Sequence, residues 1–172
     1  QHQLGSYDRK GDWAASGKIS ERLLTQLLAE PYFHQAPPKS TGRDTFHSAW
    51  IESGIAEQDI NSNKSDILCT LCELTAVSIS QQIDSVKVMS TEKIPVWIVG
   101  GGAHNDYLIE RIQHHLPGHS VNSSIHNKIN PDAIEAMMFA WFAEQRLANK
   151  TIELSNVTGA KRDAVLGGIW HP

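Results

Sequence analysis

The sequence predicts an α/β fold that is rich in helices and contains few strands. The chain has 172 residues, of which 40% are hydrophobic, enough for one domain with a real core. Most of its apolar residues recur at helical spacing. One short run, IPVWIV from Ile94 to Val99, is instead apolar at every position. That pattern is typical of a strand buried between helices on both faces.

The first half of the chain predicts helices separated by loops. Leucine and isoleucine side chains form one face of a helix from Lys18 to Ala29, and Pro31 ends it. A loop rich in proline, serine and glycine leads to a short helix near Asp44 to Ile51. The polar residues from Asn61 to Ser65 form a turn before a long helix from about Asp66 to Val86.

The second half of the chain predicts two strands, the only ones expected, and three helices. Asn130 is the N-cap of one of these helices, a strong one that has Pro131 at its first position. Two strands do not form an independently stable sheet, so we expect the chain by itself to self-associate or to be marginally stable. In chain order the elements are a strand from Ile94 to Val99, a helix from His104 to Leu116, a weaker strand from Ser120 to Ser124, a helix from Pro131 to Ala148, and a short last helix from about Lys161 to Gly167.

Charge and hydropathy exclude two classes of partner. The formal net charge is -4, and the 15 Lys and Arg residues are scattered, so we expect no nucleic-acid partner. No stretch approaches the roughly 20 apolar residues that span a bilayer, so we expect no membrane partner. The first residues lack the apolar segment of a signal peptide, which favours a cytoplasmic location.

The cysteines and histidines predict no metal site. Cys69 and Cys72 form a CxxC pattern, but they lie in the middle of a predicted helix among apolar residues, so we expect buried thiols. His114, His115 and His119 lack the spacing of metal ligands, so we expect them on the solvated surface.

Three glycines follow the predicted strand and precede a helix. Such a turn lets a backbone approach a ligand closely, and the helix N-terminus favours phosphate. A tight turn without a ligand explains Gly100, Gly101 and Gly102 equally well. The dinucleotide pattern GxGxxG fails at Asn105, and the P-loop pattern GxxxxGK[ST] fails as well.

A second loop, PPKSTGRDTF from Pro37 to Phe46, contains the lysine and hydroxyl residues of a P-loop ending. Its two prolines have no N–H groups to offer a phosphate. A turn capped by Thr41 or Asp44 is therefore favoured over a ligand-binding lip.

Several motifs together resemble one family. YDRKGDWAASGKI, PPKSTGRDTF, CELTAVSISQQI, IVGGGAHN, DAIEAMMFAWFA and NVTGAKRDAVLGGIW occur in the order seen in the C-terminal half of anhydro-N-acetylmuramic acid kinases. The resemblance covers nearly the whole chain from about Tyr7. It implies that residues 1–172 are a single C-terminal lobe of a two-lobed sugar kinase with the actin, hexokinase and Hsp70-like (ribonuclease H-like) fold.

The resemblance also implies an activity and its site. These kinases use ATP and Mg²⁺ to open the 1,6-anhydro ring of anhydro-N-acetylmuramic acid and to phosphorylate O6, in cell-wall recycling. Gly100, Gly101, Gly102 and Asn105 are then expected to bind the nucleotide, and Glu135 the sugar. The catalytic aspartate and the first phosphate loop belong to the other half, so no catalytic residue is assigned here. A homodimer is expected.

Two alternatives remain at this point. The chain could be a lobe of another sugar or acid kinase with the same fold, or a non-catalytic nucleotide-binding or regulatory module. An upstream glycine-rich loop and an aspartate would distinguish an enzyme from such a module.

Overall fold

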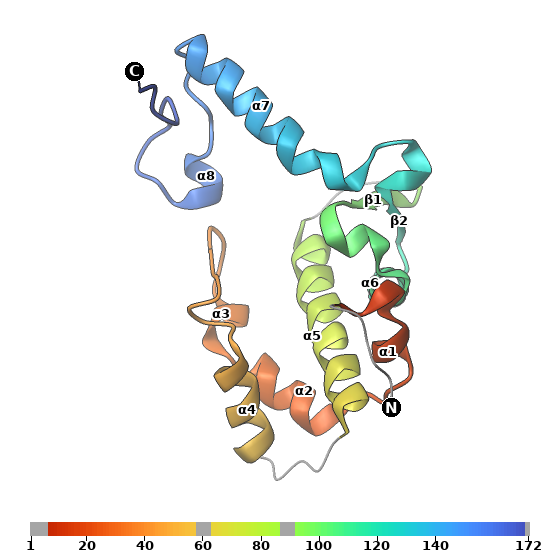
Figure 1. Cartoon of the computed structure of the whole chain (residues 1–172). Coiled ribbons are helices and arrows are strands. Elements are labelled where there is room, and N and C mark those ends of the chain that lie inside the picture. Colours follow the sequence, from red (N-terminus) through yellow and green to blue (C-terminus); the bar gives the residue numbers. More distant parts are fainter. Residues whose placement is uncertain (1–6, 58–62, 87–91, 171–172) are drawn as a thin grey trace.

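The fold is built around one long central helix. The computed structural model describes residues 7–57, 63–86 and 92–170. Helix α5 (Lys64–Ser85) has short helices on either side of it and a small sheet near its C-terminal end (Figure 1). None of the helices in the described residues is both long and apolar enough to cross a membrane.

The helices before α5 are short. The predicted helix from Lys18 to Ala29 is confirmed, with the Ser20 side chain accepting a hydrogen bond from the Leu23 N–H. Two four-residue helices were not predicted because they are too short to show a period. The elements are η1 (Arg9–Gly11), α1 (Asp12–Ala15), α2 (Glu21–Leu28), α3 (Pro31–His34) and α4 (Ser48–Glu57).

Both predicted strands are confirmed. Strands β1 (Ile94–Ile98) and β2 (His119–Ser123) are parallel, with Ile94 opposite His119 and Ile98 opposite Ser123. A parallel pair needs a crossover connection. Here that connection is η2 (Gly100–His104) followed by α6 (Asp106–His115).

The prediction that β1 is buried on both faces is wrong. Val96 and Ile98 pack against α5 and α6, whereas Pro95 and Trp97 on the opposite face are exposed. The reason is that helices cover only one face of the sheet in the described residues. The sequence pattern is still that of a doubly covered strand.

Helix α5 contributes to both hydrophobic clusters found in the described part of the chain. One cluster joins α2 to α5 through Leu23, Leu24, Leu27 and Leu74. The other joins α5, α6 and the sheet through Ala76, Ile112, Leu116 and Val121. Because Leu74 and Ala76 lie on different sides of one helix, α5 holds together parts that do not share a common core.

The C-terminal part is confirmed in one helix and corrected in another. The Asn130 side chain accepts a hydrogen bond from the Asp132 N–H, as predicted for an N-cap. The predicted helix from Lys161 to Gly167 is wrong, because Ile152 pairs with Ala164 in an antiparallel bridge that keeps this backbone extended. The elements are η3 (Ser124–Asn127), η4 (Pro131–Ala133), α7 (Ile134–Leu147) and α8 (Ser155–Thr158).

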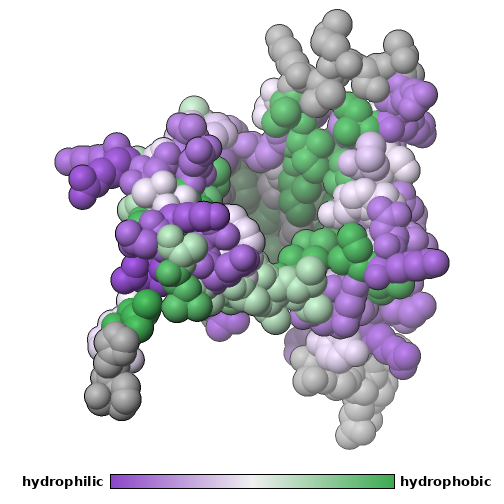
Figure 2. Space-filling model, turned by 90° about the horizontal axis from the view of Figure 1, so that it is seen from above, coloured by the Kyte–Doolittle hydropathy of each residue, from purple (hydrophilic) through white to green (hydrophobic). Residues whose placement is uncertain are grey.

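Helix α7 is apolar but uncovered. It runs away from the sheet toward α8 (Figure 1), and none of its residues is buried. Met137 is 61% exposed and Phe139 is 64% exposed. Figure 2 shows hydrophobic residues bordering a hollow in the face seen from above. A helix with large apolar side chains on its surface normally packs against other structure.

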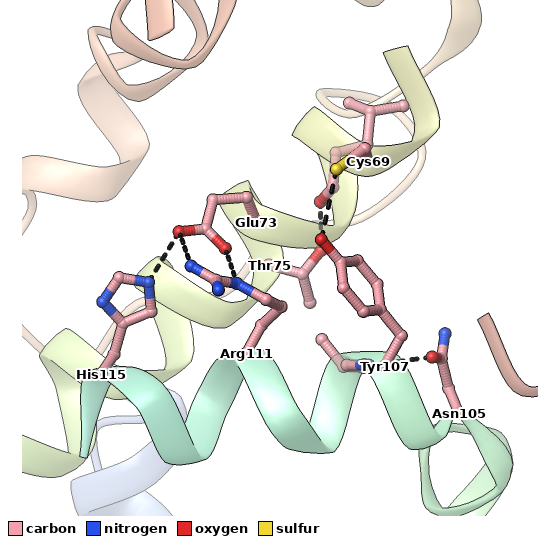
Figure 3. A network of polar contacts seen from close by, with 9 residues as sticks. Cys69, Glu73, Thr75, Asn105, Tyr107, Arg111 and His115 are labelled. Carbon is pink, nitrogen blue, oxygen red and sulfur yellow. Dashed lines mark hydrogen bonds and ion pairs between the residues drawn. The ribbon is translucent and has the colours of Figure 1, made fainter. Parts of the chain in front are cut away.

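A buried carboxylate joins α5 to α6 (Figure 3). Glu73 accepts hydrogen bonds from Arg111 Nε at 2.7 Å and Arg111 Nη2 at 3.0 Å, and its other contact is His115 Nε2 at 2.8 Å. Burial raises the pKa of Glu73, but these bonds outweigh burial, so its pKa lies below the ordinary 4.5. The prediction that His115 lies on the solvated surface is therefore wrong.

Replacing Glu73 with Gln should lower the free energy of unfolding by about 3–5 kcal/mol, because it leaves the partly buried Arg111 cation without its counter-charge. The lowered pKa of Glu73 stabilises the fold above pH 4.5, and this contribution is lost as the pH falls through the lowered value. Urea unfolding at several pH values checks both points. The control is Glu110→Gln, an exposed carboxylate on α6. Equal unfolding free energies for Glu73→Gln and wild type at pH 7 would contradict the prediction.

Candidate functional site

The glycine loop lies where β1 ends, as the sequence predicted, but it forms a 3₁₀ turn, η2, before α6 begins. Gly100 has φ +65°, a conformation that favours glycine. A Cβ atom at Gly100 or Gly101 would meet nothing within 4 Å, so this side of the loop is open. A Cβ atom at Gly102 would touch Ile98 at 3.5 Å, so Gly102 lies on the packed side.

Asn105 begins α6. Its side-chain oxygen accepts a hydrogen bond from the Leu108 N–H at 2.9 Å. On the other side lies Gly11, where a Cβ atom would collide with the Asn105 side chain and come within 2.8 Å of Tyr107 Cβ. Asn105 therefore fixes the helix start with its oxygen, and only its side-chain nitrogen is available to donate to a ligand.

The close approach of Gly11 brings a basic turn to the glycine loop. The Asp8 carboxylate holds this turn by accepting hydrogen bonds from the backbone N–H groups of Trp13 at 3.0 Å and Ala14 at 3.1 Å. Lys10 adopts φ +60°, a left-handed conformation uncommon for a residue with a side chain. Lys10 Nζ lies 3.2 Å from the Asp106 carboxylate, at the start of α6.

These segments surround one open cavity of about 680 Å³. Arg9 and Lys10 contribute positive charge, and Gly101 contributes open backbone. The sequence indicated the basic turn only as part of a family motif, because no local pattern shows that this turn contacts a loop nearly a hundred residues later. The lining residues are Tyr7, Arg9, Lys10, Gly101, Ala103, His104, Asp106, Ile125 and Asp132.

A contact between two side chains joins the glycine turn to the turn before α7, and both side chains line this cavity. His104 Nε2, at the end of the glycine turn, lies 2.8 Å from Asp132 Oδ1, in the turn before α7. Both side chains are about half exposed. Sequence analysis did not pair them, because 28 residues separate them and neither belongs to a recognised spacing.

Glu135, the residue expected to bind the sugar, lies in the first turn of α7 and is exposed. Glu135 does not line the cavity beside the glycines. The residue that reaches that cavity from this segment is Asp132, three positions earlier.

The prediction of a buried thiol is confirmed for Cys69, whose Sγ lies 3.2 Å from the Tyr107 hydroxyl. Cys72 is half-buried, and burial together with nearby negative groups raises the pKa of its thiol to about 12. A thiol with that pKa is a poor nucleophile at neutral pH. In the described parts of the chain, no three potential ligands converge where a metal ion could bind.

The PPKSTGR loop forms a turn, in which the Phe46 N–H donates to the Gly42 carbonyl at 3.0 Å. Lys39 does not face the glycine loop's cavity. Its ammonium group donates to the carbonyls of Tyr32 at 3.0 Å and Phe33 at 3.1 Å, at the end of α3. Its contacts are structural ones.

Comparison with known proteins gives one consistent result. The family described as "Anhydro-N-acetylmuramic acid kinase" matches residues 1–172. Proteins of that name from Sulfurovum sp. (strain NBC37-1) and Psychrobacter arcticus are each 42% identical to the chain, over 170 and 173 residues. The protein of that name from Saccharophagus degradans is 43% identical over 171 residues.

These alignments cover 98–99% of the chain but only 39–45% of the relatives' length. The chain therefore spans less than half of the curated relatives that it matches. The match extends over every described element, including the glycine loop, the basic turn and α7. The chain belongs to the anhydro-N-acetylmuramic acid kinase family.

Proposed function

We propose that this chain forms the C-terminal lobe of an ATP-dependent kinase that acts on 1,6-anhydro-N-acetylmuramic acid in cell-wall recycling. The observation that carries the proposal is the family match over residues 1–172. Support comes from the cavity beside Gly101, whose basic turn suits an anionic ligand. The lobe would belong to the actin, hexokinase and Hsp70-like fold and would work in the cytoplasm.

The proposed reaction joins hydrolysis to phosphoryl transfer. Water adds to C1 of the sugar, the bond from C1 to O6 breaks, O6 bonds to the γ-phosphorus of ATP, and ADP leaves. The water loses its proton to a general base. That base and the first phosphate loop are expected in the other lobe, so the role of this chain is to bind and orient.

The glycine loop is the proposed nucleotide contact. Gly101 is exposed and Gly100 is half-buried, and a Cβ atom at either would meet nothing within 4 Å, so their N–H groups can donate to phosphate or ribose oxygens. Lys10 is engaged with Asp106, whereas Arg9 makes no ion pair within the described residues, so Arg9 can face an anion. Mg²⁺ would neutralise charge on the phosphates.

The proposed quaternary state is a homodimer. The exposed side chains of α7 must be covered in the working protein, either by the rest of a full-length chain or by a second copy. Phe139 and Phe142 of α7 also line an apolar cavity of about 550 Å³ with the C-terminal segment, so this uncovered surface is continuous beyond the helix.

The proposal is tested by activity. A full-length protein carrying this chain should phosphorylate anhydro-N-acetylmuramic acid with ATP, and the 172-residue chain alone should show no turnover. Loss of a general base alone slows catalysis by about 10²–10⁴-fold. Mass spectrometry of the sugar product is the measurement. Turnover by the chain alone would place the base within it, and no reaction of the full-length protein would favour a non-catalytic module.

Gly101→Val in the full-length protein should raise the KM for ATP about tenfold, equivalent to one lost hydrogen bond, and leave the KM for the sugar nearly unchanged. The new side chain enters open space in this fold, so it should obstruct the ligand without disturbing packing. The matched control is Gly118→Val, which also enters open space but lies in the turn after α6. Equal increases in both KM values would indicate general damage and remove the loop from the nucleotide site.

Glu135→Gln should weaken sugar binding by about 1.5–3 kcal/mol, the contribution of a charged hydrogen bond, and leave ATP binding unchanged. Titration calorimetry of the full-length protein with sugar alone measures this. Glu144→Gln, an exposed carboxylate further along α7, is the control. If Glu135→Gln binds the sugar as tightly as wild type, Glu135 serves only the helix N-terminus, where a negative charge is favourable.

A further inference from the structure

We propose that the hydrogen-bonded pair His104–Asp132 is a positioning device that couples the nucleotide loop to the sugar-binding helix. The inference rests on the proposed function, because it needs ATP at the glycine loop and the sugar near Glu135. The pair is the point at which those two segments are held together by side chains. Neither residue is assigned here to the chemistry itself.

The pair joins two turns that each lead directly into a ligand-binding segment. His104 is the last residue of η2, two positions after Gly102. Asp132 is the middle residue of η4, three positions before Glu135. The 2.8 Å contact from His104 Nε2 to Asp132 Oδ1 therefore joins the two binding segments directly.

Local contacts fix the backbone around each of the two partners. The Asn130 side chain accepts from the Asp132 N–H at 3.0 Å, and Pro131 beside it is buried, so the Asp132 backbone is fixed. Next to His104, Ala103 is 3% exposed, and the Asn105 N–H donates to the Gly102 carbonyl at 3.1 Å. A movement of the glycine loop would thus be transmitted to η4 through the pair.

The exposure of the pair argues against a role in folding stability. The side chains of His104 and Asp132 are 47% and 62% exposed, and ion pairs of that kind contribute little to stability. The ion pair between Lys10 and Asp106, at 58% and 67% exposure, lies in the same cavity but joins η1 to the start of α6 and does not reach α7. Among the ion pairs of the described residues, only His104–Asp132 joins η2 to the turn that leads into α7.

The test measures the coupling between the two ligands in the full-length protein. Titration calorimetry gives the affinity for a non-hydrolysable ATP analogue with Mg²⁺, in the absence and in the presence of saturating sugar. In wild type the sugar should strengthen analogue binding by about 5–150-fold, the usual range of coupling between sites. In His104→Ala, Asp132→Ala and the double variant alike, the strengthening should fall to within about twofold of none.

Three further results complete the design. Because the two residues act as one unit, the double variant should lose no more coupling than either single variant. His104→Arg, which restores a donor to Asp132, should recover most of the coupling. His114→Ala, an exposed histidine at the opposite end of α6, should couple as wild type does. Thermal midpoints of all variants should stay close to that of wild type.

The inference is overturned if wild type binds both ligands without coupling, or if His104→Ala retains full coupling. Additive losses in the double variant also overturn it, as does a fall in thermal midpoint that parallels the loss of coupling and is not relieved by His104→Arg. Failure of wild type to bind either ligand would instead refute the proposed function, so the two failures are distinguishable.

Discussion

The buried charge of Glu73 is the constraint on which the arrangement of this chain depends. A carboxylate that is 4% exposed needs its partners nearby, and both partners, Arg111 and His115, lie four residues apart on one face of α6. That requirement fixes α6 against α5. The start of α6 then places the glycine loop, and through the contact of Asn105 with Gly11 it also places the basic turn. The ion network of Glu73 therefore determines where the segments that line the cavity lie.

Local signals in the sequence predicted much of the fold correctly. The side chain of Asn130 caps the turn before α7 as expected, because a cap depends only on residues two or three positions away. Both strands were found near their observed bounds. The short helix expected from Lys161 to Gly167 was wrong because a long-range bridge to Ile152 decides that backbone, and no local pattern reports such a bridge.

The candidate site was predictable only in part, for the same reason. The glycine loop is a local motif, and its place after a strand was readable. The ion partners were not, because Glu73 is 38 residues from Arg111 and 42 from His115. His115 was assigned to the surface because it lacks the spacing of a metal ligand, while its actual partner lies on another helix. The charges that shape a site are brought together by tertiary packing, which spacing along one segment does not encode.

The bare surface of α7 has a consequence for how the segment that carries Glu135 becomes ordered. None of the fourteen residues of α7 is buried, so the helix depends largely on its own backbone hydrogen bonds, and isolated helices of this length are marginal in water. Folding of α7 is then coupled to the docking of whatever covers it, and the entropy of ordering is lost in that step. Docking of the surface that covers α7 would therefore also fold the segment that carries Glu135.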